Sequence, residues 1–277
     1  MRASRVIPLV AALVLTGAAV LADAPQRVVS VNLCTDQLGL MLASPGQLIS
    51  VSKLAHDPES SSMADAAQSL PVNGSGAEEV FLLNPDLVLA GTFTADATVQ
   101  MLRDLGIRVE LFAPASSLAD VPARIAQMGV ALGRQSEARA MIDAFNAELA
   151  ELSKAPPRRP RAALYYVNSY TMGDRTLAGD ILRAGGFDNV ASEAGMTYGG
   201  TLFLEQLVML SPEVIVQGRD YPGQARAEDN LEHPALARLT NSRVAGTLTD
   251  RDWICGTPMV LNAVREMRDL RLSMEQD

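Results

Sequence analysis

Short apolar segments rich in β-branched residues alternate with segments of helical periodicity over the first part of the chain. Each apolar segment is flanked by Pro, Gly, Asn or Asp, which is typical of a short buried strand. Predicted helices lie between them, for example over 37–43 and 98–105. Because strands separated by helices pair in parallel through crossover connections, the pattern predicts a layered α/β lobe. The predicted strands span 27–31, 48–52, 87–90 and 107–112.

The alternation stops between residues 118 and 152, where apolar residues recur every three or four positions and no strand is predicted. Pro122 suits the first turn of a helix, and Gly133 suits the end of one. Ser136 is a candidate N-cap for a second helix that runs to about Ser153. At ~1.5 Å per residue this second helix would span about 26 Å, roughly the width of a small domain.

Beyond a proline-rich break, strands are predicted again at 162–167, 214–217 and 243–246. Two segments of the chain also align without a gap: residues 78–91 and, 127 residues later, 205–218. They share a Glu, a Pro, an acidic residue after the Pro, and a Gly in one register. Four marked positions in register are hard to obtain by chance. We therefore predict two similar α/β lobes joined by a helix.

The N-terminus has the layout of a secretory signal peptide. Arg2 and Arg5 precede an apolar stretch over 6–20, which leads to small residues ending at Ala22. The apolar stretch is about fifteen residues, shorter than the ~20 that span a membrane. We expect cleavage near Ala22 and export of a protein that is not membrane-embedded.

The predicted parts are a signal peptide (1–22), an N-terminal lobe (23–117), a helical linker (118–154) and a C-terminal lobe (155–277). Composition agrees with a globular protein, because 48% of residues are apolar and 20% are charged. The net charge of −9, with no basic run, argues against nucleic-acid binding. Two cysteines and two histidines leave little for a structural zinc site. No serine-hydrolase elbow, His-Glu-x-x-His or phosphate loop is present, so we expect no enzyme activity.

The predicted export, the twin Glu-x6-Pro-acid segments and the helical linker resemble the periplasmic substrate-binding proteins of ABC importers. The similar branch is the one for ferric siderophores, haem and cobalamin, to which the opening Arg27-Val-Val-Ser-Val-Asn and closing Trp253-Ile-Cys-Gly-Thr-Pro segments are also similar. The resemblance covers about Arg27 to Leu270. It implies two Rossmann-like lobes with mostly parallel sheets, joined by a long α-helix, with the ligand cleft between them.

The resemblance also implies that one glutamate on each lobe docks onto arginines of a permease dimer. The matching residues are Glu78 and Glu205, while Glu79 aligns with Gln206 and is the weaker candidate. Both glutamates could instead be ordinary acids in the first turn of a helix, where the helix dipole favours them. The shared register favours docking, because two charges on one rigid body orient an encounter better than one.

Ligands of such lobes bind outside the carboxyl ends of the parallel strands. Many of the chain's few aromatic and basic residues lie in the loops that are expected at these carboxyl ends. Rings for stacking and cations for negative groups suit a flat macrocycle or an anionic chelate. The candidate ligand-binding residues are Cys34, Asp36, Lys53, His56, Phe93, Tyr170, Arg175, Tyr198, Arg219, Tyr221, Trp253 and Cys255.

Several candidates have other interpretations. Trp253 could plug the second lobe, His56 is as readily an exposed loop histidine as an axial metal ligand, and Asp36 could cap a helix that begins near Gln37. Tyr165 and Tyr166 lie in a predicted strand, so at least one should be core. Neither a catalytic residue nor a protein-borne metal site is assigned.

The two cysteines leave three alternatives open. A disulfide between Cys34 and Cys255 would tie the lobes together across the mouth of the cleft, as an exported compartment permits. Ligand-facing free thiols are equally supported. Two unrelated buried cysteines are the third alternative.

The favoured hypothesis is a periplasmic, monomeric capture protein for a ferric siderophore or related iron complex, which it delivers to an ABC permease. Haem is an alternative because His56, Tyr170 and Tyr221 could supply donors. Cobalamin is another, and would depend more on aromatic walls. A periplasmic sensor or scaffold and an exported enzyme are less favoured. The protein is expected to hold no cofactor of its own.

Overall fold

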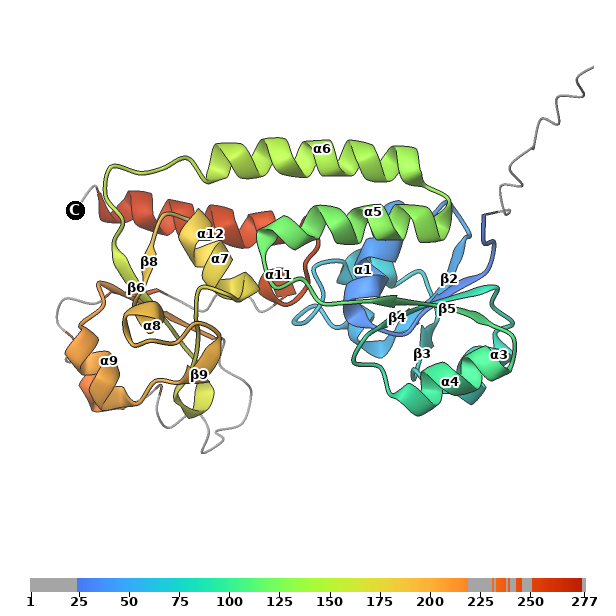
Figure 1. Ribbon diagram of the computed structural model, residues 1–277, viewed down its shortest axis with the longest axis horizontal. Helices are drawn as coiled ribbons and strands as arrows, with labels where there is room; N and C mark the ends of the chain where they lie inside the picture. The colour runs from blue at the N-terminus through green and yellow to red at the C-terminus, as the bar shows by residue number, and fades with distance from the viewer. Residues whose placement is uncertain are drawn as a thin grey trace, which may run out of the picture.

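The computed structural model describes residues 24–218, 231, 233–237, 239, 243–245 and 251–275. The predicted signal peptide, Arg219 and Tyr221 therefore lie outside the described residues. Two lobes lie side by side below a layer of long helices (Figure 1). Within the described ranges, no helix is both long and apolar enough to cross a bilayer.

The N-terminal lobe is built on a five-stranded sheet in the order β3-β2-β1-β4-β5, and every pair is parallel. All four strands predicted in this lobe are confirmed. The unpredicted β3 has two residues and no apolar run to mark it. The strands are β1 (Val28–Ser30), β2 (Leu48–Ser52), β3 (Val72–Asn73), β4 (Leu87–Gly91) and β5 (Arg108–Phe112). The helices are α1 (Leu33–Leu42), the 3₁₀ helix η1 (Lys53–His56), α2 (Ala64–Ala67), α3 (Ala77–Leu82) and α4 (Asp96–Asp104).

Strand β4 is apolar along its length because both of its faces are covered. Leu87 and Leu89 belong to a core cluster that includes Leu38 of α1. Val88 and Ala90 belong to a second cluster with side chains of α3 and α4. A continuous apolar run is what a parallel strand between two helical layers requires.

The C-terminal lobe repeats this plan with the parallel order β11-β10-β6-β8. A separate antiparallel ribbon joins β7 and β9. The strands are β6 (Arg161–Tyr165), β7 (Tyr170–Met172), β8 (Asp188–Asn189), β9 (Gly199–Thr201), β10 (Val214–Gln217) and β11 (Arg243–Ala245). The helices are η3 (Val167–Ser169), α7 (Leu177–Ala184), α8 (Val190–Glu193), α9 (Leu204–Leu210), α10 (Pro234–Ala237), α11 (Arg251–Ile254) and α12 (Val260–Met274).

The linker contains η2 (Leu118–Asp120), α5 (Val121–Leu132) and α6 (Gln135–Leu152). It is a helical hairpin, in which α6 is the predicted long helix and α5 packs along it (Figure 1). Gly133 ends α5 with a φ of 70°, as its position predicts. The N-cap assigned to Ser136 is wrong, because α6 already begins at Gln135 and the Ser136 hydroxyl bonds to Glu137.

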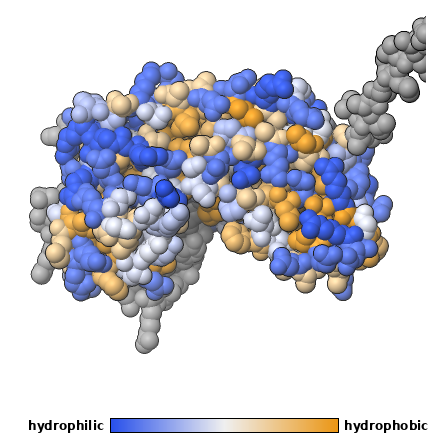
Figure 2. Space-filling view, viewed as in Figure 1, coloured by the Kyte–Doolittle hydropathy of each residue, from blue (hydrophilic) through white to orange (hydrophobic). Residues whose placement is uncertain are grey.

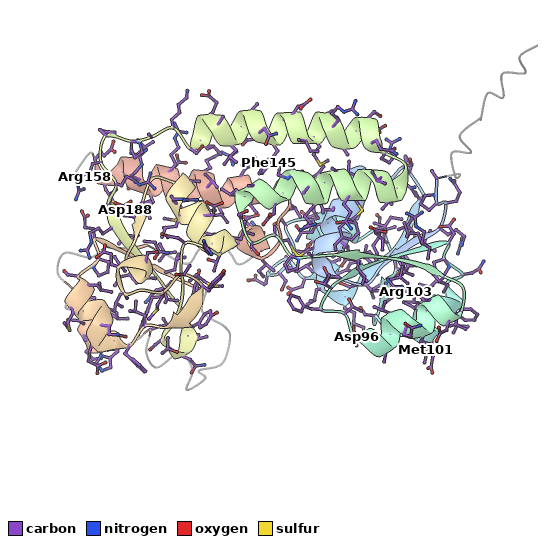
Figure 3. The ribbon with its side chains drawn as sticks, in the orientation of Figure 1. Asp96, Met101, Arg103, Phe145, Arg158 and Asp188 are labelled. Atoms are coloured by element: carbon purple, nitrogen blue, oxygen red, sulfur yellow. A yellow bond between two sulfur atoms is a disulfide. The ribbon has the colours of Figure 1, made fainter. Side chains whose placement is uncertain are left out.

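The helical layer also joins the two lobes through one apolar core. Phe145 points from α6 into this layer (Figure 3). It shares a cluster with Val28 and Leu89 of the first sheet and with Leu164 of the second. The two lobes therefore have a common core on the helical side and separate only on the opposite side.

The repeated segments have the same backbone as well as the same sequence pattern. Asn84 and Ser211, 127 residues apart, both have a positive φ, of 48° and 47°. Val80 and Leu207, also in register, are both fully buried. The duplication predicted from the sequence is confirmed at the level of single dihedral angles.

Candidate functional site

The strand order of each sheet identifies an equivalent position for a binding site in the two lobes. Chain order reverses between β1 and β4 in the first sheet and between β6 and β10 in the second. Loops that leave the carboxyl ends of such strand pairs diverge to opposite faces of the sheet and open a crevice. The candidate site is therefore where these two crevices face each other.

A cavity of about 670 Å³ lies between the lobes. One side comes from the loop after β5, and most of the rest comes from the C-terminal lobe and α11. Four residues predicted from the sequence meet here: Tyr170, Arg175, Tyr198 and Trp253. The other lining residues are Ala115, Ser116, Tyr166, Met172, Thr176, Leu177, Ala178, Gly199 and Ile254.

The ribbon of β7 and β9 carries the aromatic part of this wall. Tyr170 begins β7, directly after Asn168 and Ser169, which both have positive φ values. Tyr198 precedes β9, and its hydroxyl lies 3.5 Å from Nη1 of Arg175. This ribbon was not predicted from the sequence, because its strands are short and lack apolar alternation.

Gly199 gives Tyr170 the room that its position needs. A Cβ atom at residue 199 would lie 1.9 Å from the Tyr170 hydroxyl, well inside van der Waals contact. Any side chain at that position would therefore displace the ring. The pairing of Met172 with Gly199 and of Tyr170 with Thr201 fixes the ribbon beside the cavity.

Trp253 lies at the cavity and also packs into the protein interior, the two positions considered for it. It lies on α11, lines the cavity and is packed against the core cluster. Its buried indole Nε1 has no hydrogen-bond partner among the described residues. Tyr165, by contrast, is fully buried core, as expected for at least one of the two adjacent tyrosines, and its hydroxyl lies 3.0 Å from Ser169 Oγ.

The N-terminal lobe contributes a smaller hollow of about 240 Å³ at the carboxyl ends of β1, β2 and β3. Asn32, Lys53, Asn73 and Ser75 line it, and Lys53 is exposed. Phe93, in the loop after β4, is 87% exposed and lines neither cavity. A ligand role for Phe93 stays a prediction.

The helix-cap interpretation of Asp36 is wrong, and its fully buried side chain, which lines neither cavity, argues against the predicted ligand role. Helix α1 begins at Leu33, and its N-cap is Asn32, whose Oδ1 accepts the Cys34 N–H at 3.0 Å. Asp36 is therefore one turn inside the helix, where its carboxylate accepts the Ser52 N–H at 3.1 Å and the Ser52 hydroxyl. Burial raises the pKa of Asp36 above its usual value of 3.8, despite these hydrogen bonds.

His56 is half-buried and bonded to the backbone. Its Nε2 donates to the carbonyls of Ala67 and Leu70, at 2.8 and 3.1 Å. Because both acceptors are backbone carbonyls, the proton is on Nε2 and the ring ties η1 to the segment of α2. The imidazole is therefore not a freely exposed loop histidine, and because it lines neither cavity its ligand role stays a prediction.

The cysteines are joined. Cys34 and Cys255 form a disulfide across 221 residues, with their Cα atoms 5.1 Å apart. Of the alternatives left open by the sequence, the cross-lobe disulfide is confirmed, and the ligand-facing free thiols are wrong. Both sulfur atoms are consumed by the bond, so neither is available to a ligand or its metal.

The disulfide is part of a wider contact, which we call the clasp, formed by residues 251–258 against the N-terminal half. The Ser62 hydroxyl lies 2.8 Å from both the Arg251 carbonyl and the Asp252 carboxylate. Gly256 packs so closely on Ala115 that a Cβ atom would lie 2.1 Å from the Ala115 Cβ. The clasp thus joins the lobes beside the cavity, close below the helical layer (Figure 1).

The two predicted docking glutamates are exposed on equivalent helices. Glu78 lies in the first turn of α3, and Glu205 lies in the first turn of α9. These helices occupy the lower end of each lobe, opposite the helical layer (Figure 1). Glu79 instead accepts the Gly74 N–H at 2.7 Å, while Gln206 accepts the Phe203 N–H at 3.2 Å.

Two α/β lobes with a cross-lobe cavity define a ligand-capture protein. The chain matches the family model described as "Periplasmic binding protein" over residues 28–241, and it belongs to that family. The resemblance to periplasmic binding proteins that the sequence suggested is therefore confirmed at the level of the family. Members of this family are substrate-binding transport proteins rather than enzymes.

Among curated proteins, the chain is similar to "Cobalamin-binding protein" from two strains of Halobacterium salinarum, ATCC 29341 / DSM 671 / R1 and ATCC 700922 / JCM 11081 / NRC-1. In each case 28% of 230 residues are identical, covering 81% of this chain and 60% of the relative. The chain thus spans about 60% of the length of these relatives.

Three solved structures illustrate the likeness in fold. The haem-binding protein RhuT of Roseiflexus sp. RS-1 has a TM-score of 0.72 and 21% identity, covering 88% of this chain and 98% of its own. The haem-binding protein HutB of Vibrio cholerae has a TM-score of 0.72 and 20% identity, covering 90% and 98%. The vitamin B12 binding protein BtuF of Vibrio cholerae has a TM-score of 0.66 and 17% identity, covering 91% and 98%.

Proposed function

We propose that this protein, exported by its signal peptide and acting as a monomer, captures a corrinoid in the cross-lobe cavity. It then delivers the corrinoid to an ABC permease. The observation that carries the ligand class is the character of the cavity wall. Tyr170, Tyr198 and Trp253 supply rings there, and Arg175 is the single cation among the described lining residues.

The relative number of aromatic and positively charged side chains in the cavity wall distinguishes between the candidate ligands. An anionic ferric siderophore would need several positive groups, both to offset its own charge and to overcome the chain's net charge of −9. A corrinoid presents a large, flat, mostly apolar body, for which aromatic stacking is the main source of affinity. The described wall therefore favours the corrinoid over the siderophore that the sequence alone favoured. The cobalamin-binding relatives support the same choice.

Haem is the second candidate, because the phenols of Tyr170 and Tyr198 reach the cavity and a phenolate is a known axial ligand of haem iron. No histidine lines the cavity within the described part of the chain. A haem complex would therefore require one of the tyrosines as its donor.

Glu78 and Glu205 are the proposed contacts to the permease. Both are exposed at the ends of the lobes, whereas Glu79 is engaged by the Gly74 N–H. Each exposed ion pair contributes little by itself. Two carboxylates on one rigid body would fix the orientation of the complex and speed its formation.

Titration of the purified protein with cyanocobalamin, haemin and a ferric catecholate tests the ligand class. Trp253, the sole tryptophan, lines the cavity, so a bound ligand should quench its fluorescence to saturation. Because these ligands absorb light, each titration is paired with calorimetry and with an optical blank of free tryptophan. Saturable heat with cyanocobalamin alone is expected. Heat with haemin alone would select the second candidate, and no heat with any ligand would remove the capture proposal for all three.

Docking is tested separately by the double variant Glu78→Ala with Glu205→Ala. The expected result is lost corrinoid uptake in host cells, with unchanged ligand affinity of the purified variant. Reduced affinity instead would mean that these carboxylates act within the fold.

A further inference from the structure

Leu82 of α3 and Met209 of α9 are large apolar side chains held almost entirely in solvent. Leu82 is 82% exposed and Met209 is 85% exposed. The residues before them, Phe81 and Val208, are also matched, at 44% and 41%. Each of these pairs is separated by the same 127 residues as the two glutamates.

Leu82 and Met209 lie outside the buried core of their lobes. Val80 and Leu207, fully buried, already anchor the two short helices to their lobes. Leu82 and Met209 each follow the docking glutamate by four positions, which places the carboxylate and the apolar group on one face of the helix. Single exposed apolar residues are ordinary. The same acid and apolar pair at the same position of both lobes is a repeated surface feature.

In the N-terminal lobe, a hollow also lies beside Glu78. A cavity of about 340 Å³ between α3 and α4 is lined by Glu78, Glu79, Thr98 and Met101. Met101 is labelled beside α4 at the lower side of the lobe (Figure 3). Two carboxylates at an otherwise small and apolar hollow suit a cationic side chain with an aliphatic stem, such as arginine. Figure 2 shows apolar and hydrophilic residues intermixed at this lower end of the lobe.

We propose that Leu82 and Met209 are the apolar anchors of the docking surface, and that their partner is a two-fold symmetric permease dimer bearing cations. The inference rests on the docking role proposed above for Glu78 and Glu205. Because α3 and α9 present equivalent surfaces on the two lobes, the partner should present two equivalent binding sites, which a symmetric dimer does. The carboxylates select and orient the partner, while the apolar groups, once desolvated, supply affinity that exposed ion pairs do not.

The test uses the host's own permease and ATPase in lipid nanodiscs and measures the binding-protein concentration that half-maximally stimulates ATP hydrolysis. Leu82→Ala and Met209→Ala should each raise this concentration about fivefold, and the double variant about 25-fold, because each removes one apolar anchor. The exchange variant Leu82→Met with Met209→Leu should behave as the wild type, because both positions stay apolar. Val130→Ala, an exposed apolar control on α5, should change nothing.

The outcomes separate this inference from the docking proposal. If Glu78→Ala with Glu205→Ala abolishes stimulation while the Leu82 and Met209 double variant matches the wild type, docking stands and the anchor inference is overturned. If wild-type protein binds empty anionic nanodiscs and the double variant does not, a lipid surface is the occupant and the inference fails. If wild-type protein does not stimulate the permease at all, both proposals fail together.

Discussion

Asp86 and Glu213 accept the same backbone hydrogen bond in the two lobes. Asp86 Oδ1 accepts the Arg27 N–H directly before β1, and Glu213 Oε1 accepts the Arg161 N–H at the start of β6, both at 3.0 Å. Each carboxylate follows the turn that the two repeats share and precedes the strand that pairs with β1 or β6. The acid after proline in the sequence repeat is therefore a clamp between neighbouring strands. The glutamates at the other end of the repeat face solvent.

Removing the disulfide should loosen the clasp. Cys34→Ser with Cys255→Ser opens a closed loop of more than 200 residues, so we expect the free energy of unfolding to fall by about 2–4 kcal/mol. Urea unfolding followed by circular dichroism measures the loss. Reductant should lower the midpoint of the wild type and leave the double variant unchanged. Equal sensitivity of both proteins to reductant would contradict a stabilising disulfide.

Gly256 should tolerate no side chain while Ala115 faces it. A Cβ at residue 256 would lie 2.1 Å from the Ala115 Cβ, so Gly256→Ala should destabilise the protein by about 1–3 kcal/mol through overpacking. The compensating change Ala115→Gly should restore most of the loss in the double variant. The matched control is Ala115→Gly alone. Absence of rescue would mean that the contact between the clasp and the loop after β5 is not the cause.

Asp36 should make stability fall as pH rises from about 4 towards neutrality. Burial raises its pKa above 3.8 in the folded state, so the folded chain holds a proton that the unfolded chain has already lost. In that pH window ionisation favours the unfolded state, and stability decreases as pH rises through the folded-state pKa. Asp36→Asn keeps the shape without the charge, so its pH profile should be flatter. Urea midpoints between pH 4 and 8 measure the difference.

The control for this comparison is Asp65→Asn, which alters an exposed carboxyl of α2. Its profile should run parallel to that of the wild type. A wild-type profile that rises relative to Asp36→Asn over the same window would show that the carboxylate form is favoured by folding.

Loss of the aromatic wall should weaken ligand capture without unfolding the protein. Tyr198→Ala removes an exposed ring from the cavity, and we expect affinity for the captured ligand to fall about tenfold, in line with about 1.4 kcal/mol of lost stacking. Gly199→Ala should also weaken binding, because the new Cβ displaces the Tyr170 hydroxyl. Calorimetry measures both.

Phe203→Ala removes an exposed ring of the same lobe that does not line the cavity, and it serves as the matched control. Its affinity should equal that of the wild type. Equal weakening by Phe203→Ala and Tyr198→Ala would indicate a general effect on the lobe, not a loss of stacking in the cavity.

The sequence by itself determined the architecture, because its signals are local. Apolar runs between Gly, Pro, Asn and Asp located the main strands, and the three- and four-residue spacing located the linker helices. The register between Glu78 and Glu205 located the duplication, since a repeated chain folds into a repeated backbone. Short polar strands such as β7 and β9 were not predicted, because two or three residues carry no measurable periodicity.

Only the tertiary structure decided which loop residues face the cavity. Asp36 turned inward because α1 begins four residues earlier than predicted, and His56 turned to two carbonyls of the α2 segment. Cys34 and Cys255 can form a disulfide because the packing of the clasp places their Cα atoms 5.1 Å apart. Distances between residues far apart in the chain depend on how the lobes pack, and no pattern within a single segment encodes that packing.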